Sequence, residues 1–289
     1  MTEPTKKQVQ LLLKAACEHA GSQGIWSKRH EVSSATVSNI LAGKWSTIAD
    51  KMWLKVAAAL KYQGLEWQTA HTADFVLMQE FCRMAQAQSA SAAVSYDAGG
   101  GKTHALQHYA AKHKNVFVIQ CAEYWTKKLF LSSLYRSLGK DPSGRTCPEL
   151  AEGIIAELRQ LNKPLMVIDE IDKLRDPLVM YYIELYNKLD GICGFLLVGA
   201  PHLRIAWERN AQRDKRGFKE IYSRVGRRFL RLNGVKQKDV ALICEANGVG
   251  DAAQVQAVWN AIEDNKDLRR VKREIERIHM GNKPLADVA

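Results

Sequence analysis

The sequence predicts an α/β protein in which a mostly parallel β-sheet follows one small helical region and precedes another. Three observations support this prediction. Between residues 74 and 233, short apolar runs alternate with amphipathic helical stretches, which is the pattern of βαβ units. The residues before 66 and after 234 show the helical spacing of apolar side chains instead. A chain of 289 residues is long enough for one large domain and one or two small ones.

The central region contains five apolar runs that are short enough to be buried strands of a parallel sheet. They read AAVSY (92–96), VFVIQC (116–121), PLMVID (164–169), GFLLVGA (194–200) and RFLRL (228–232). The predicted helices of this region cover 74–88, 103–113, 126–138, 147–161, 178–189 and 203–222. Helices are also predicted over 6–20 and 48–61, and the chain from 236 to 279 is predicted to be helical.

The first strand leads into a glycine-rich segment, SYDAGGGKT (95–103). Its end fits the phosphate-binding pattern G-x-x-x-x-G-K-[ST], but Tyr96 stands at the first glycine position. Backbone N–H groups of such a loop cradle phosphates, and the following helix adds positive potential. The alternative is an ordinary strand–turn–helix with an exposed lysine. On the first interpretation, the residues expected to bind ATP are Asp97, Ala98, Gly99, Gly100, Gly101, Lys102, Thr103 and His104.

Two acidic residues end the strand in PLMVIDEIDKL (164–174), about 65 residues after the loop. Asp169 and the Thr103 hydroxyl are expected to hold Mg²⁺. Glu170 is expected to polarise the water that attacks the γ-phosphate, while Lys102 contacts the β- and γ-phosphates. A strand that ends in solvated acids is the alternative for this motif alone. The two motifs together, in this order, predict an ATP-binding P-loop fold.

The region from 74 to 279 resembles the AAA+ ATPases, through its GGGKT loop and its DEIDKL motif. The resemblance implies a P-loop core with a five-stranded parallel sheet, followed by a helical lid, and ATP hydrolysis. It also implies an arginine that contacts the γ-phosphate bound to a neighbouring subunit, within EIYSRVGRRFLRL. Arg224 is the first choice, with Arg227 and Arg228 as alternatives. DNA contact is the other use that these arginines could have.

Two sensor positions of that family differ in this sequence. After the fourth strand, where a polar residue is expected, the sequence has Gly199 and Ala200, and His202 is the only substitute nearby. The lid segment GVGDAAQVQ (248–256) lacks the arginine expected there. These departures predict either slow hydrolysis or hydrolysis that needs a partner to complete the site.

The segment SQGIWSKRHEVSSATVSNILAGKW (22–45) resembles the helix-turn-helix of phage repressors, with helices at 22–30 and 34–42. Val37, Ile40 and Leu41 are expected to face the core. A small helical bundle that contacts proteins is the alternative. If the segment binds DNA, the residues expected at base edges are Ser34, Ala35, Ser38 and Asn39, and those expected at phosphates are Lys28, Lys44 and Arg29.

The charge balance favours a polyanionic partner. The chain has 42 Lys and Arg against 31 Asp and Glu, a net charge of +11, and basic surfaces bind nucleic acid by releasing counterions. Lys127 and Lys128 begin the helix after the second strand and are expected to grip the DNA backbone; a solvated helix end is the alternative. The widely spaced cysteines and the lack of a signal peptide or membrane-spanning run predict a cytoplasmic protein without a membrane partner.

The order of these parts, predicted as 1–66, 74–233 and 234–289, resembles the Mu B-like ATPases of phage and transposon DNA transposition. The resemblance implies ATP-bound subunits that assemble into a helical filament or ring on double-stranded DNA and then recruit and activate a transposase. Two alternatives remain. One is a helicase loader or replication initiator of similar architecture, and the other is a helix-turn-helix repressor with a degenerate ATPase core.

Overall fold

The computed structural model describes residues 1, 3–60, 67–227 and 229–279. They form two compact units. One unit comprises Met1–Ala70, Gln237–Asn265 and Arg269–Ala289, and the other comprises His71–Lys236 with Lys266–Leu268. None of the described helices combines the length and the apolar character needed to cross a bilayer.

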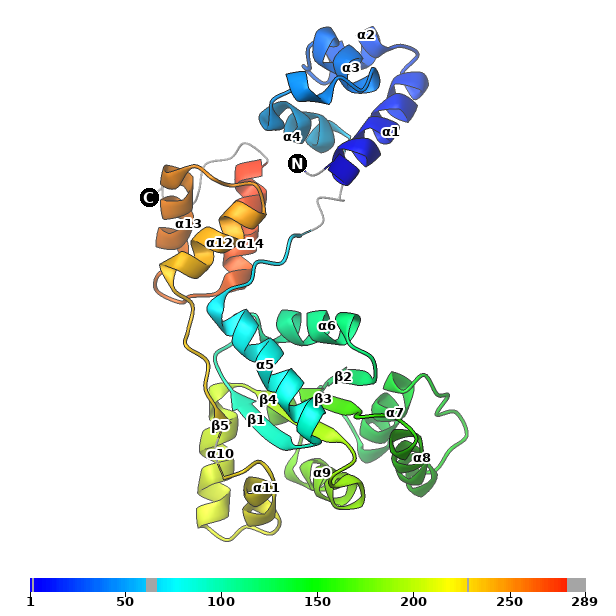
Figure 1. Cartoon of the computed structure of the whole chain (residues 1–289), viewed down its shortest axis with the longest axis vertical. Coiled ribbons are helices and arrows are strands. Elements are labelled where there is room, and N and C mark those ends of the chain that lie inside the picture. Colours follow the sequence, from blue (N-terminus) through cyan, green and yellow to red (C-terminus); the bar gives the residue numbers. More distant parts are fainter. Residues whose placement is uncertain (2, 61–66, 228, 280–289) are drawn as a thin grey trace. The chain divides into compact units, whose positions relative to one another are not determined.

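The larger unit is built on a five-stranded sheet whose pairs are all parallel (Figure 1). The predicted fold of this region, an α/β core with a five-stranded parallel sheet, is therefore confirmed. The sheet order is β2-β3-β4-β1-β5, so β4 lies between the strand that precedes the glycine loop and the strand that ends in Asp169. The strands are β1 (Ser91–Ser95), β2 (Val116–Gln120), β3 (Leu165–Asp169), β4 (Gly194–Gly199) and β5 (Phe229–Leu230).

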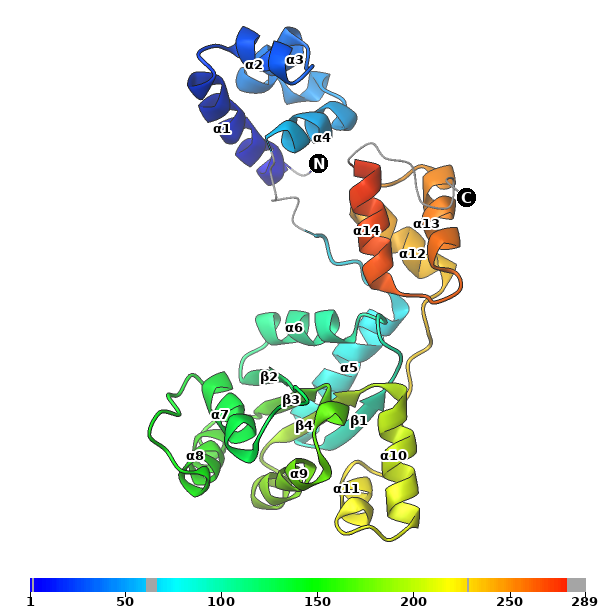
Figure 2. The same ribbon diagram turned by 180° about the vertical axis from the view of Figure 1, so that it is seen from behind.

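Helices cover both faces of this sheet, which is why every residue of β3 and β4 is buried. Side chains alternate between the faces, so that Leu196 packs with α5 and α6 while Leu197 packs with the helices of the opposite face. Figures 1 and 2 show α5 and α9 on opposite sides of the sheet. The helices are α5 (Ala73–Gln88), α6 (Lys102–Lys112), α7 (Lys127–Ser137), α8 (Cys147–Arg159), α9 (Asp176–Leu189), α10 (Pro201–Gln212) and α11 (Phe218–Arg224).

One predicted element of this unit is wrong. A single helix was expected over 203–222, but α10 ends at Gln212 and α11 begins at Phe218. Two residues between them, Asp214 and Gly217, have left-handed backbone angles of φ 55° and 84°. Such angles stop an α-helix, and glycine adopts them without a steric penalty. The amphipathic spacing continues across the break, because Phe218 and Ile221 are buried like Trp207. The apolar pattern of the sequence therefore does not reveal where α10 ends.

The N-terminal residues form helices around a separate core that includes Trp53, Val37 and Ile40. These helices are α1 (Glu3–His19), α2 (Gln23–Arg29), α3 (Ser34–Leu41) and α4 (Asp50–Ala59), with a 3₁₀ turn η1 (Trp45–Thr47) before α4. Ser22 and Ser33 cap α2 and α3 by accepting hydrogen bonds from the N–H groups of Ile25 and Thr36. The C-terminal helices are α12 (Gln237–Ala246), α13 (Ala252–Ile262) and α14 (Leu268–His279).

Candidate active site

The glycine-rich loop joins β1 to α6 as the sequence predicts. Gly99 and Gly101 have φ angles of 79° and 82°, which only glycine adopts readily. Gly101 is also the N-cap of α6, and no side chain caps this helix end. The first turn of α6 therefore adjoins the glycine loop without a side-chain cap. An anion fits this arrangement, because an uncapped helix start presents both N–H donors and positive potential.

Tyr96, at the position where the phosphate-binding pattern has its first glycine, packs against the loop. A Cβ atom built on Gly100 would lie 2.8 Å from Cε1 of Tyr96, and one built on Gly234 would lie 2.9 Å from its hydroxyl. The ring thus fills the space beside two glycines. Burial raises the pKa of Tyr96, and the charges of Asp74 and Asp97 raise it further. The loop keeps its course with tyrosine at this position because the side chain lies against backbone that has no side chain of its own.

Lys102 lies across the start of the loop. Its Nζ donates hydrogen bonds to the carbonyl oxygens of Tyr96, at 2.6 Å, and of Asp97, at 2.7 Å. The ammonium group is thereby held over the loop and 5.9 Å from the centre of the Tyr96 ring. A cation at this place suits the β- and γ-phosphates of a nucleotide. The neighbouring residues Asp97, Ala98 and His104 are exposed.

Thr103 and Asp169 meet across the sheet edge, although 66 positions separate them in the chain. The Thr103 hydroxyl donates to Oδ2 of Asp169 at 2.6 Å, and the Glu170 N–H donates to Oδ1 at 2.9 Å. Asp169 is 1 % exposed. Burial raises the pKa of this carboxyl group, although both hydrogen bonds and the charge of Lys102 oppose the rise. A hydroxyl and a buried carboxylate form an oxygen donor set that fits Mg²⁺.

Glu170 follows directly and occupies a strained backbone conformation, with φ 55°. Its carboxylate forms an ion pair of 2.6 Å with Lys173, and this contact raises the pKa of Lys173. The side chain is partly exposed, so water can reach it. The expected general base is therefore next to the metal ligand pair and is neutralised by a lysine of its own turn.

Asp172, which was not among the residues predicted from the sequence, supplies polar groups at the end of β4. Oδ1 of Asp172 accepts a hydrogen bond from the Ala200 N–H at 3.1 Å, and Oδ2 lies 3.2 Å from Nε2 of His202. Gly199 is required here, because a Cβ would lie 2.5 Å from Oδ1 of Asp172. The third acidic residue of DEID was the available signal. It escaped notice because the sensor was sought on β4 itself rather than on the neighbouring turn.

A second feature that sequence reasoning missed is the segment Lys266–Leu268, at the start of α14. The Leu268 N–H donates to the Gly99 carbonyl at 3.0 Å. The carboxylate of Asp267 lies so close that a Cβ on Gly99 would be 2.2 Å from its Oδ1. The second sensor was expected at 248–256. The segment that contacts the loop is instead 266–268, and the basic pair Arg269 and Arg270 follows it.

The arginines expected to act on a neighbouring subunit differ in their surroundings. Arg224 is held within its own unit, because its Nη2 lies 2.7 Å from a carboxylate oxygen of Glu220 and 2.8 Å from Oδ1 of Asn187. Its guanidinium also lies 5.5 Å from the ring centre of Tyr186. Arg227 is exposed and has a left-handed φ of 57°. Arg228 lies outside the described residues.

The residues expected to contact DNA occur in both units. On α3, Ser34, Ala35 and Ser38 are exposed and Asn39 is partly exposed, as is expected of the face opposite Val37 and Ile40. Lys44, after α3, is exposed too. On α7, Lys127 lies 4.6 Å from the ring centre of Tyr181, whereas Lys128 lines a shallow pocket together with Arg136. The Lys127 ammonium is exposed but is thus partly engaged by Tyr181 of its own unit.

Residues 87–205 match the family model of an AAA domain. The matched range runs from the end of α5 to the beginning of α10, so it includes the glycine loop, Lys102, Asp169 and Glu170. No curated protein matches the chain. The geometry around Thr103 and Asp169 agrees with this match, because a loop, a lysine and a strand-end carboxylate meet where the AAA domain implies a nucleotide. The chain therefore contains an AAA domain, of the P-loop NTPase class, within its five-stranded α/β unit.

Proposed function

We propose that this protein is an ATPase that binds double-stranded DNA when it carries ATP, assembles on the DNA as a homo-oligomer, and recruits and activates a transposase. The observation that supports the ATPase activity is the 2.6 Å contact between the Thr103 hydroxyl and Asp169 beneath an uncapped helix start. The exposed polar face of α3 and the net charge of +11 support DNA as the partner.

Each residue of the ATP site has a distinct role in this proposal. The N–H groups of residues 99–103 and the Lys102 ammonium bind the phosphates. Thr103 and Asp169 hold Mg²⁺, which neutralises charge on the phosphates when it is bound. Glu170 orients and deprotonates the attacking water. Since Lys173 pairs with Glu170 at 2.6 Å, hydrolysis requires that this carboxylate turn from the lysine toward the water.

Assembly is coupled to the nucleotide through an arginine of the next subunit. A single chain supplies the loop, the metal ligands and the base, and an exposed cation at the end of α11 is suited to reach a site on another copy. Arg227 is exposed, whereas Arg224 is paired with Glu220 and Asn187. Arg224 therefore acts in this way only if these contacts are released on assembly. Weak DNA contacts from many subunits then add up along one duplex.

Electron microscopy of the Glu170→Gln variant tests this proposal. The variant should bind ATP without hydrolysing it, so we expect long-lived filaments or rings on duplex DNA in the presence of ATP and Mg²⁺. Isolated particles under those conditions would contradict the assembly. Adding a transposase that this protein serves should stimulate hydrolysis by the unmutated chain. Stimulation by a replicative helicase, and none by transposase, would favour the helicase-loader alternative.

A further inference from the structure

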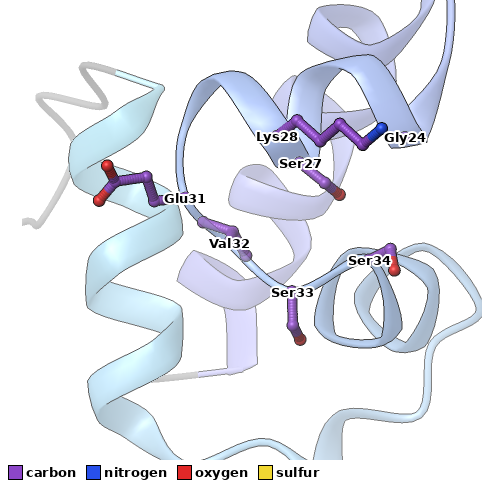
Figure 3. Close-up of a pocket in the computed structure, with 7 residues that line it drawn as sticks. All are labelled: Gly24, Ser27, Lys28, Glu31, Val32, Ser33 and Ser34. Carbon is purple, nitrogen blue, oxygen red and sulfur yellow. The ribbon is translucent and has the colours of Figure 1, made fainter.

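The N-terminal bundle contains a pocket of about 420 Å³ between α2 and the beginning of α3 (Figure 3). The pocket is lined by Gly24, Ser27, Lys28, Glu31, Val32, Ser33 and Ser34. Every lining residue belongs to α2, α3 or the turn that joins them.

The observation that points most strongly to a ligand in this pocket is the hydroxyl of Ser27. This residue is 3 % exposed, and its Oγ has no hydrogen-bond partner within the described part of the chain. A buried hydroxyl without a partner is costly, because it has lost its hydrogen bonds to water. Figure 3 shows Ser27 projecting from α2 on the side of Ser34. A ligand with an acceptor oxygen would satisfy this hydroxyl.

The start of α3 contributes two more donors. Ser33 caps the helix, and its Oγ and carbonyl oxygen accept from the N–H groups of Thr36 and Val37. The N–H groups of Ser34 and Ala35 have no acceptor among the described residues, as is usual for a first helical turn. They add to the positive end of the helix dipole beside the pocket.

The charges around the pocket also favour an anion. Lys28 is exposed, and no ion pair or side-chain hydrogen bond of Lys28 occurs among the residues that the structure describes. Glu31 is the acidic residue of the lining, but its carboxylate points away from Ser33 and Ser34. Its carbonyl oxygen already accepts a hydrogen bond from Nζ of Lys55 at 2.7 Å.

We infer that this pocket binds a backbone phosphate of double-stranded DNA, held by the Ser27 hydroxyl, the Lys28 ammonium and the N–H groups of Ser34 and Ala35. The inference rests on the proposed DNA binding and gives it a place. Under this inference, Ser34 and Ala35 contact the DNA backbone and not base edges, whereas Ser38 and Asn39 remain the residues expected to contact the bases. Binding by this part of the chain is therefore largely independent of DNA sequence.

Two substitutions in the full-length protein test the site, with DNA affinity measured over a range of salt concentrations. Ser27→Ala should weaken binding about tenfold without changing the salt dependence, because it removes a neutral donor to a charged group. Lys28→Ala should weaken binding to a similar extent and lower the slope of log affinity against log salt by about 0.9. Lys28→Arg should restore both values.

The controls separate the site from general effects. Lys14→Ala makes the same charge change at an exposed position of α1, and we expect little change in affinity. Ser27→Ala should not lower thermal stability, since the hydroxyl it removes is unpartnered. If the unmutated protein binds DNA and neither Ser27→Ala nor Lys28→Ala differs from Lys14→Ala, this inference fails while the proposed function stands. If the unmutated protein binds no duplex DNA, both fail.

Inorganic phosphate provides a further arm of the test. At equal ionic strength, it should stabilise the unmutated protein against heat no more than it stabilises Ser27→Ala, because a single phosphate group is held firmly only as part of a duplex. Stabilisation that depends on Ser27, combined with unchanged DNA affinity of the variant, would reassign the pocket to a small free anion and overturn the inference.

Discussion

The loop before α6 and the turn before α3 both place the start of a helix beside a lysine, yet they are built differently. The loop before α6 is supported by distant parts of the chain, since Asp169 of β3 and Leu268 of α14 both contact it. The pocket at the turn before α3 is lined by residues 24–34, and one distant side chain, Lys55, bonds the turn through the Glu31 carbonyl. A site assembled from distant segments can report its occupancy to those segments. The pocket before α3 has fewer such links. We therefore assign the ATP-dependent switch to the loop before α6 and simple attachment to DNA to the pocket before α3.

Removal of Lys102 is expected to have the largest effect and tests this division directly. Lys102→Ala should lower ATP affinity by at least about 100-fold, because the β- and γ-phosphates lose their cation. DNA affinity measured without nucleotide should stay unchanged. Calorimetry with ATP and Mg²⁺, beside DNA titrations of the same sample, measures both quantities. A variant that loses nucleotide-free DNA binding as well would show that the two sites are not separate.

The next largest effects are expected from substitution of Arg227, which follows α11, and of Arg224, the last residue of α11. Arg227→Ala should reduce ATP turnover at least tenfold with near-normal ATP binding, because the cation acts on a neighbouring subunit. Arg224→Ala should also lower thermal stability, since Arg224 pairs with Glu220 and Asn187. Steady-state hydrolysis on DNA and thermal melting measure these effects. Full turnover by Arg227→Ala together with lost turnover by Arg224→Ala would assign the role to Arg224.

A smaller effect is expected from Asp169→Asn, which removes a buried charge. The raised pKa of Asp169 means that the folded protein binds its proton more tightly than the unfolded chain does. Stability from this group is therefore present below the unfolded pKa and declines as pH rises through the folded pKa. At pH 7 without Mg²⁺, Asp169→Asn should raise the melting temperature by a few degrees. With ATP and Mg²⁺ the order should reverse. An equal or lower melting temperature of the metal-free variant would contradict the claim that the buried Asp169 carboxylate destabilises the fold in the absence of Mg²⁺.

The smallest expected effect on nucleotide binding is that of Tyr96→Gly, which restores the usual first glycine of the loop. ATP affinity should change by less than about threefold, because the ring packs on Gly100 and Gly234 and is not needed for phosphate binding. Stability should fall by about 2 kcal/mol, as the half-buried ring is lost. Denaturant unfolding and an ATP titration measure the two. A large loss of ATP affinity would make Tyr96 part of the binding site.

These differences also explain which residues of the candidate sites could be predicted from the sequence. The contact between Thr103 and Asp169 could be predicted because strand ends of a parallel sheet meet at one edge, so two short motifs were enough to bring these residues together. Asp172 and the segment 266–268 were missed because their partners, Ala200 and Gly99, are backbone groups. Backbone acceptors and donors leave no residue-type signal. The unpartnered hydroxyl of Ser27 was equally invisible, since only a fold shows whether a serine is buried.

The break between α10 and α11 shows the same limit in the fold. Its position depends on Asp214 and Gly217 adopting left-handed angles, while the apolar spacing on either side remains helical. The N-terminal helices were predicted more closely, because Ser22 and Ser33 give local capping signals that need no distant partner.

The central claim is that ATP and Mg²⁺ in the loop at 97–104 control binding to DNA. The most direct test measures the affinity of the unmutated protein for duplex DNA at one salt concentration, with a non-hydrolysable ATP analogue and Mg²⁺ and then without nucleotide. We predict that the analogue tightens DNA binding at least tenfold and makes it cooperative. Equal affinity and equal cooperativity under the two conditions would contradict the proposed switch.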